Sequence, residues 1–568
     1  MGVSMKEPLA LQVRQRLRPY MAALAGFSLA SNLLLLVSPL YMLQVYDRVL
    51  SSASTDTLIW LSVLAVFLLG VYGAAEAGRR RVSALAGQEL DALLVPLAFA
   101  RFETESGAPH LARDLGAIQR VQTALQSGSL LPFADLPFAP LFLVVLFLIH
   151  PVLGMIGLLG AAIVFAVAVT AELTTRQAGQ FSQGALRSAG DFAAGLERQR
   201  SAMAAMGLVP AAFRRWRASQ SAGQSFSMDA AKDDGKFSAI SRSTRQILQI
   251  CVLGGGAALA LSQEISPGAI VASSIILART LGPIDQIVGG WRNTIQTWSA
   301  WKGLTERLEG AEAEPRFTPL PRPAAELKLD RLSVVVPGAE APQIRPFSWS
   351  ASGGQLVAVT GGNGAGKTTL LQTLAGAWQP GSGAMSLGGR NLHDWPGPDR
   401  GRHVGYVPQD VELLPATVGE NIARLGEADA DAIIAAARAA GAHETILSLP
   451  DGYDTRVGPG GTHLSAGQRQ MIGLARALFG DPVLLLLDEP TANLDAAAAP
   501  GLVNALRQAA ERGAIILAAT HDRRVIERAK TVLLVRNGDV MAAPAEQFLK
   551  LATGPGAGSH VSGRGGAA

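Results

Sequence analysis

The fold of the second half of this chain is decided by the stretch Gly361-Gly362-Asn363-Gly364-Ala365-Gly366-Lys367-Thr368. It follows the strand-like run 355–360 and precedes Thr369-Leu370-Leu371, which opens a helix, and a phosphate-binding loop requires this context. Its glycines allow backbone N–H groups to turn around phosphates, and the helix N-terminus adds positive potential. We therefore predict that Lys367 contacts the outer phosphates of a nucleoside triphosphate and that Thr368 ligates Mg²⁺.

An acidic pair, Asp488-Glu489, ends the apolar run 483–487. Such a run is typical of a buried parallel strand, and the ends of these strands present side chains to a cleft. We expect Asp488 to hold Mg²⁺, directly or through water, and Glu489 to polarise the attacking water as a general base. Alone, the pair would also fit a helix N-cap, and only the upstream loop favours the metal site.

Two isolated residues complete the expected site. Gln409 follows Tyr406-Val407-Pro408 and is expected to sense the metal and the water from a flexible loop, and His521 follows the apolar run 514–517 and is expected to bond the terminal phosphate. A lone Gln or His is usually structural, so both assignments depend on the order of the motifs.

Composition indicates two modules and a membrane protein. The chain has 568 residues, of which 49% are apolar, and its mean hydropathy is +0.25. Charge is nearly balanced, with 49 Lys and Arg against 45 Asp and Glu, which argues against an electrostatic nucleic-acid binder. The single cysteine, Cys251, excludes an internal disulfide framework and a multi-cysteine metal site.

Apolar runs in the first half predict six helical spans, because a bilayer crossing needs about 20 apolar residues. The runs are 21–45, 57–75, 136–149, 152–171, 247–261 and a weaker one from about 265, which Arg279 and Asp285 interrupt near its end. The third and fourth flank His150-Pro151 and should form a helical hairpin. The long segments between spans should extend them as helices with a turn at each tip. A signal peptide fits the first run poorly, because the run is too long and lacks a small-residue cleavage pattern.

Clusters of basic residues predict the orientation of the spans in the membrane, because short flanking segments rich in Lys and Arg stay on the cytoplasmic side. Three such clusters fall on one side of the membrane: Arg14, Arg16 and Arg18; residues 79–81; and Arg214, Arg215 and Arg217. Their position predicts that the N terminus and the second half of the chain lie in the cytoplasm. The expected domains are a six-helix transmembrane domain with cytoplasmic helical extensions (1–309), a Pro-rich linker (310–325), a nucleotide-binding domain (326–552) and a disordered Gly-rich tail (553–568).

In these motifs and their order the chain resembles the ABC transporter ATPases, and specifically half-size exporters. The resemblance rests on the phosphate loop, Gln409, Leu464-Ser465-Ala466-Gly467-Gln468-Arg469-Gln470, Asp488-Glu489, Asn493-Leu494-Asp495 and His521. It implies an α-helical six-span transmembrane domain of the type I ABC exporter kind, followed by an α/β P-loop ATPase domain.

The resemblance also implies ATP and Mg²⁺ as cofactors and a homodimer that traps two nucleotides, with Ser465 and Gly467 of one copy facing the phosphates held by Lys367 of the other. Glu489 and His521 are then the catalytic residues, and Thr368, Gln409 and Asp488 surround the metal. The expected nucleotide-binding residues are Gly361, Gly362, Asn363, Gly364, Ala365, Gly366, Lys367, Thr368, Thr369, Gln409, Ser465, Ala466, Gly467, Gln468 and Asp495.

A narrower resemblance lies in the first half. Residues 40–50 (LYMLQVYDRVL), 135–142 (DLPFAPLF) and 289–292 (GGWR) are similar to permease/ATPase subunits of bacterial type I secretion systems, particularly those exporting proteases and lipases. That resemblance implies a multi-pass inner-membrane protein that exports unfolded polypeptides, often with calcium-binding repeats, through a periplasmic membrane-fusion adaptor and an outer-membrane channel. Only about 20 residues precede the first span, which leaves no room for an N-terminal peptidase domain.

Three positions depart from the family pattern: Pro459 stands where an acidic residue is usual, Ala466 replaces a glycine, and no aromatic residue near 336–337 is placed to stack adenine. Asp135 and Asp285 near span ends are candidate substrate contacts. The alternatives are an exporter of lipid, drug or short peptide, a soluble ABC protein acting on ribosomes or DNA, which the six spans disfavour, and a membrane scaffold that binds ATP without turnover.

Overall fold

The computed structural model describes residues 8–104, 111–309, 320–336, 338–339, 341–461, 463–494 and 498–553. The chain divides into two compact units, Met1–Phe102 with Pro109–Glu314, called here the helical unit, and Glu103–Ala108 with Pro315–Ala568, called the α/β unit. The expected linker 310–325 and tail 553–568 lie largely outside the described residues.

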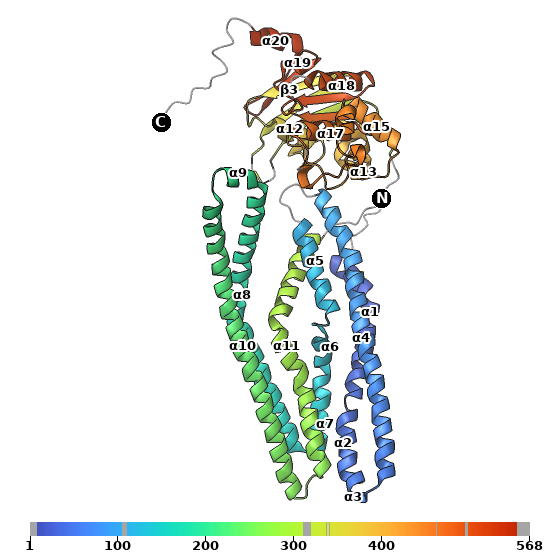
Figure 1. Cartoon of the computed structure of the whole chain (residues 1–568), viewed down its shortest axis with the longest axis vertical. Coiled ribbons are helices and arrows are strands. Elements are labelled where there is room, and N and C mark those ends of the chain that lie inside the picture. Colours follow the sequence, from blue (N-terminus) through green and yellow to red (C-terminus); the bar gives the residue numbers. More distant parts are fainter. Residues whose placement is uncertain are drawn as a thin grey trace. The chain divides into compact units, whose positions relative to one another are not determined.

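The helical unit is all helix in its described part (Figure 1). Its elements are α1 (Leu9–Leu34), α2 (Val37–Gln44), the π-helical turn η1 (Val45–Val49), α3 (Leu50–Ser52), α4 (Thr55–Thr104), α5 (Leu111–Gln126), α6 (Leu131–Asp135), η2 (Leu136–Phe138), α7 (Ala139–Ile149), α8 (Pro151–Arg198), α9 (Arg200–Ala205), α10 (Val209–Leu261) and α11 (Pro267–Leu308).

Six helical stretches among the described residues are long and apolar enough to cross a membrane, which confirms the six-span prediction. They are Leu9–Ser52, Thr55–Phe102, Leu131–Ile149, Pro151–Ala171, Val209–Leu261 and Pro267–Trp291. The sixth, which looked weakest in the sequence, belongs to a helix that continues past Arg279 and Asp285 to Leu308.

The predicted hairpin between the third and fourth spans is present. His150 is extended, with φ −162° and ψ 136°, and its ring Nδ1 accepts the Val152 N–H at 3.2 Å, which caps the first turn of α8. Pro151 fits the first helical position because its missing N–H would have no partner there. The predicted helical extensions are also present: α8 and α10 pack along their length, and α9 lies at the turn that joins them (Figure 1).

Asp47 joins the first span to the last. It lies in η1, and its carboxylate accepts the backbone N–H of Gly268 at 2.8 Å and the Ser266 hydroxyl. A side chain at Gly268 would place Cβ 2.6 Å from the Asp47 carboxylate, so only glycine allows this approach. A carboxylate at a helix N-terminus is favoured by free N–H groups and the helix dipole.

Asp135 and Asp285 both have partners inside the helical unit. The Asp135 carboxylate lies 2.5 Å from an Arg79 guanidinium nitrogen and accepts from the Asn32 amide at 2.9 Å, which joins α6, α4 and α1. Asp285 of α11 accepts from the Ser241 hydroxyl at 2.5 Å and pairs with Arg245 at 3.0 Å. These carboxylates therefore connect helices within one protomer, and a substrate contact for them stays a prediction.

The α/β unit is built on two sheets. Its strands are β1 (Glu326–Val334), β2 (Ile344–Ser352), β3 (Leu356–Gly361), β4 (Ser382–Leu387), β5 (Arg390–Asn391), β6 (Val404–Val407), β7 (Leu484–Asp488), β8 (Ile515–Ala519), β9 (Thr531–Arg536) and β10 (Asp539–Pro544). Among the described residues, one sheet has the order β10-β9-β3-β8-β7-β6, in which all neighbours are parallel except β10, and the other has the order β2-β1-β4-β5.

The helices and short helical turns of this unit follow one another in chain order. They are α12 (Lys367–Leu374), the short turn η3 (Leu392–Asp394), α13 (Gly397–His403), α14 (Val418–Ile422), α15 (Ala430–Ala439), α16 (His443–Leu447), η4 (Gly452–Asp454), η5 (Pro459–Gly461), α17 (Ala466–Leu478), α18 (Ala499–Glu511), α19 (Arg523–Ile526) and α20 (Ala545–Thr553).

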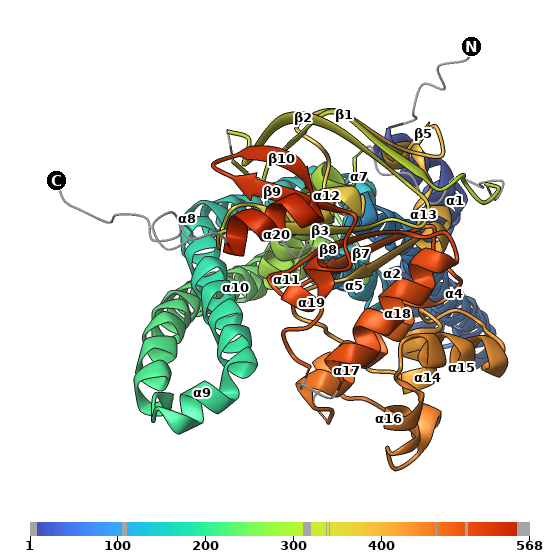
Figure 2. The ribbon, with the colours of Figure 1, turned by 90° about the horizontal axis from the view of Figure 1, so that it is seen from above.

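Both faces of the larger sheet are covered. Alternate residues of β3 point to opposite sides: Leu356 and Ala358 pack with α17 and α18, whereas Val357 and Val359 pack with α12 and the four-stranded sheet (Figure 2). All five residues of β7 are buried, which confirms the buried parallel strand predicted for the run before Glu489. This doubly covered sheet fixes the ends of β3 and β7, where the candidate site lies.

Candidate nucleotide site

The phosphate loop leaves β3 and enters α12. Gly361, Gly364 and Gly366 have φ values of 158°, 75° and 105°, which favour glycine. A Cβ at Gly361 would lie 2.3 Å from the Val535 carbonyl oxygen, so a larger residue cannot be placed there without moving β9. The loop therefore has the backbone geometry that turns N–H groups toward an anion.

Lys367 is held across this loop. It is 9% exposed, and its Nζ donates to the Gly361 carbonyl oxygen at 2.9 Å and lies 3.2 Å from His521 Nε2. The ammonium therefore lies beside a cavity of about 260 Å³ lined by residues 363–369, Gln343, Gln409, Asp488 and Glu489. Residues from four separate stretches of the sequence thus meet at one place; the strand-end argument predicts this for all of them except Gln343.

Asp488 has the environment of a metal ligand. It ends β7 and is 1% exposed, and burial raises the pKa of its carboxyl group, while the Thr368 hydroxyl and the Lys367 charge act in the opposite direction. Its Oδ2 is buried and has no hydrogen-bond partner among the described residues. A buried carboxylate oxygen beside a hydroxyl group suits Mg²⁺, which prefers oxygen ligands. In proteins this ion usually retains several water ligands and also binds phosphate oxygens of the substrate.

The described residues contain no cluster of three or more His, Cys, Asp or Glu side chains able to hold a metal by themselves. A Mg²⁺ ion at this site would therefore depend on Thr368 and Asp488 together with oxygen atoms of the nucleotide and of water. The hydroxyl of Thr368 and the buried carboxylate of Asp488 fit such an ion.

Glu489 lies in a strained backbone conformation. Its φ is 46°, in the left-handed region that non-glycine residues rarely adopt, and its N–H donates to the Ala519 carbonyl oxygen at 2.8 Å, across to β8. Its side chain lines the cavity, and its carboxylate lies 3.9 Å from His521 Nε2. Strain of this kind costs about 1–3 kcal/mol and is found mainly at functional sites.

The motif at 464–468 lies elsewhere in the same protomer. Ser465 accepts the Gln468 N–H at 3.2 Å, and Gln468 Oε1 accepts the Ser465 N–H at 2.8 Å, so the two form a capping box at the start of α17. None of Ser465, Ala466, Gly467 and Gln468 lines the cavity. Ala466 is exposed, which leaves room for its extra methyl group. Asp495 lies outside the described residues.

Gln343, directly before β2, was missed from the sequence. Its Nε2 donates to the Gly364 carbonyl oxygen at 3.1 Å, and its Oε1 accepts from the Thr369 hydroxyl at 2.7 Å. One side chain thus connects the phosphate loop to the first turn of α12. No sequence signal marks it, because the contact depends on how the β1–β2 hairpin packs against a loop 21 residues further along the chain.

Replacing Gln343 should weaken nucleotide binding. In Gln343→Ala both contacts to the loop are lost, and we expect the Kd for ATP to rise about five- to tenfold, since a hydrogen bond contributes about 1 kcal/mol. Gln343→Glu keeps the acceptor for Thr369 and loses the donor to Gly364, so its Kd should lie between those of wild type and Gln343→Ala. Titration with a fluorescent ATP analogue measures this, and equal affinity in all three proteins would contradict it.

Comparisons with known proteins agree with this geometry. Residues 344–492 match the family described as "ABC transporter", and residues 462–527 match one described as "AAA domain, putative AbiEii toxin, Type IV TA system". A bacterial Atm1-family ABC exporter with ATP bound has the same fold, with a TM-score of 0.80 at 20% identity over 94% of this chain and 96% of its own.

Two relatives extend the similarity over both units. The type I secretion system ATP-binding protein PrsD of Rhizobium meliloti (strain 1021) is 35% identical over 94% of this chain and 93% of its own. The cyclolysin secretion/processing ATP-binding protein CyaB of Bordetella pertussis (strain Tohama I) is 27% identical over 93% of this chain and 75% of its own. The chain therefore belongs to the ABC transporters, as a half-size exporter that couples ATP hydrolysis to transport.

Proposed function

We propose that this protein is the ATP-driven permease of a type I secretion system, which moves unfolded polypeptides out of the cell. The observation that carries this proposal is the similarity to PrsD along both the helical and the α/β unit, rather than along the ATPase alone. CyaB, another relative whose name states a secretion role, matches over the same extent. The export of lipid, drug or short peptide is the alternative.

The cavity residues have distinct roles in this proposal. Lys367 binds the outer phosphates, Glu489 takes a proton from the attacking water, and His521 bonds the terminal phosphate from its position between the two. Thr368, Asp488 and Gln409 surround Mg²⁺, which when bound neutralises charge on the phosphates. The glycine-rich loop, with Gly361, Gly364 and Gly366 at positive φ, supplies backbone N–H groups that turn toward the phosphates.

A homodimer completes the site. Ser465 and Gly467 lie at the N-terminus of α17, where free N–H groups favour an anion, but they do not line the cavity of their own protomer. In the proposed dimer they contact the phosphates that Lys367 of the other copy holds. The same dimer lies in the inner membrane with the N terminus and the α/β units in the cytoplasm, and it contacts a periplasmic membrane-fusion adaptor and an outer-membrane channel.

Secretion by the cell tests this function. A strain that lacks the protein should fail to release at least one large polypeptide, and the wild-type gene should restore release whereas Glu489→Gln should not. The measurement is a comparison of the culture media by mass spectrometry. An unchanged set of released polypeptides, together with a loss of lipid or drug efflux, would overturn the proposal in favour of the alternative.

A further inference from the structure

Arg279 is an unpaired charge in a helix that is long and apolar enough to cross a membrane. It lies 12 residues after Pro267, where α11 begins, its side chain is exposed, and it has no hydrogen bond or ion pair with any described residue. An arginine within a span is costly in lipid, and such residues face a water-filled cavity or a partner and mark substrate paths. Arg279 lines a cavity in the helical unit, and no described carboxylate pairs with it, so its charge is available to an anionic ligand.

Two further polar residues lie on the face of α11 that carries Arg279. Gln286 and Asn293 follow at intervals of seven residues and are also exposed. Residues at this spacing share one face of a helix, and fourteen residues extend about 21 Å along its axis. Arg279, Gln286 and Asn293 are called here the α11 stripe.

Two cavities are lined by residues of this stripe. The first, of about 280 Å³, is lined by Arg279 and Gln286 together with Glu76, Arg79 and Asp135. Its acidic groups are already paired, since Asp135 pairs with Arg79, and Glu76 with Arg79 and Arg80. Three arginines and two carboxylates line this cavity, so it carries one excess positive charge, on the unpaired Arg279.

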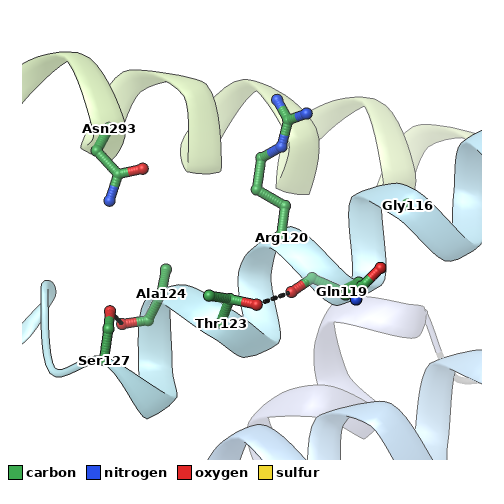
Figure 3. Close-up of a pocket in the computed structure, with 7 residues that line it drawn as sticks. All are labelled: Gly116, Gln119, Arg120, Thr123, Ala124, Ser127 and Asn293. Atoms are coloured by element: carbon green, nitrogen blue, oxygen red, sulfur yellow. Dashed lines mark hydrogen bonds between the residues drawn. The ribbon is translucent and has the colours of Figure 1, made fainter.

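The second cavity, of about 300 Å³, lies between α5 and α11; Ser127 lines it, and the next residue along the chain, Gly128, lines the first. Figure 3 shows Asn293 on α11 across from Thr123 on α5, with the Arg120 side chain extending from α5 toward α11. Arg120 also has no ion pair among the described residues. The lining is therefore made of amides, hydroxyl groups and a second cation.

We infer that the α11 stripe is the track that contacts the exported polypeptide, and that Arg279 binds an acidic side chain of that polypeptide. This inference rests on the proposed function. Side-chain amides both donate and accept hydrogen bonds, which matches the alternating N–H and C=O groups of an extended chain. A lipid would place one anionic head group at Arg279 and then apolar chains against Gln286 and Asn293, which these amides do not match.

The test uses the full-length protein in nanodiscs of zwitterionic lipid and two fluorescent probe peptides. Both are unstructured Gly/Ser peptides; one carries several Asp residues and the other carries Asn in their place. Arg279→Gln should raise the Kd for the Asp peptide about tenfold and leave that for the Asn peptide unchanged, since a charged hydrogen bond contributes about 1.5–3 kcal/mol. Arg279→Lys should restore most of the affinity. Fluorescence anisotropy measures each Kd.

Two further variants separate the stripe from general effects. Gln286→Leu combined with Asn293→Leu should weaken both peptides, because the amide contacts do not depend on peptide charge. Arg242→Gln is the matched control: Arg242 is an exposed arginine on α10 whose guanidinium bonds Ser238 of the same helix, and its loss should change neither Kd.

Several results would overturn the inference. The first is an equal loss of affinity for both peptides in Arg279→Gln, and the second is a loss of affinity that depends on the content of anionic lipid and not on the peptide. The third is a shift of Arg279→Gln from dimer to monomer by light scattering, which would mean that Arg279 pairs with the second copy. If wild-type protein binds the Asp peptide and Arg279→Gln changes the Kd for the Asp and Asn peptides by the same factor, this inference alone fails. If neither peptide binds wild-type protein, the polypeptide cargo of the proposed function fails with it.

Discussion

Glu489→Gln should lower ATP turnover at least about 100-fold while ATP still binds with nearly wild-type affinity, because general-base catalysis contributes about 10²–10⁴-fold. The amide has the shape of the carboxylate but cannot accept a proton from water. The side chain lines the cavity opposite the phosphate loop and does not hold Lys367 or Thr368, so nucleotide contacts remain. Phosphate release under saturating ATP and Mg²⁺ measures turnover, and a fluorescent ATP analogue measures binding.

Glu511→Gln is the matched control for this variant. Glu511 is an exposed carboxylate at the end of α18 that pairs with Arg507 of the same helix, and the Glu511→Gln protein should turn over ATP like wild type. Turnover in Glu489→Gln within about threefold of wild type would remove Glu489 as the base. Equal, near-zero rates in wild type and Glu489→Gln would instead favour a scaffold that binds ATP without hydrolysing it.

Lys367→Ala and Ser465→Arg should each abolish ATP turnover alone, yet a mixture of the two should regain part of it. In the proposed dimer each nucleotide contacts Lys367 of one copy and Ser465 of the other. A mixed dimer then has one site with both defects and one intact site. Random mixing in equal amounts makes half of the dimers mixed, and in the isolated mixed dimers half of the nucleotide sites should be intact.

The mixture is co-expressed with two different affinity tags, and the mixed dimers are isolated by two successive purifications before turnover is measured. Ser465→Ala is the control for the capping box, because it removes the hydroxyl that accepts the Gln468 N–H without adding bulk. No recovery in mixed dimers that retain both tags would mean that Lys367 and Ser465 act on the same nucleotide within one copy, against the proposed arrangement.

Much of the fold could be predicted because membranes and parallel sheets impose simple patterns. Lipid offers no partner for backbone N–H and C=O groups, so each apolar run must be a helix, and His150-Pro151 marks the break between α7 and α8. A fully buried strand such as β7 is apolar on both faces and stands out in the same way. The register of β1 with β2 and β4 was not predictable, because it depends on contacts between distant segments.

In the candidate site, too, residues in local motifs could be predicted, whereas contacts between distant segments could not. Lys367, Asp488 and Glu489 could be placed together because their motifs follow parallel strands of one sheet, whose carboxyl ends meet at one edge. Gln343 precedes a strand of the other sheet, and its contacts with Gly364 and Thr369 arise only when the two sheets pack. Nor does any pattern reveal that Glu489 has a left-handed backbone, since that conformation is set by its neighbours in the folded sheet.

The stretch LYMLQVYDRVL, which suggested the secretion branch, contains the carboxylate of Asp47 that caps α11. Any motion that pulled η1 away from Gly268 would leave the amides of that helix end without an acceptor inside the membrane protein, and would also expose a charged group. Separating the first and last spans at this end therefore costs the bond between a carboxylate and a helix N-terminus, which opposes the opening of a gap between these two helices.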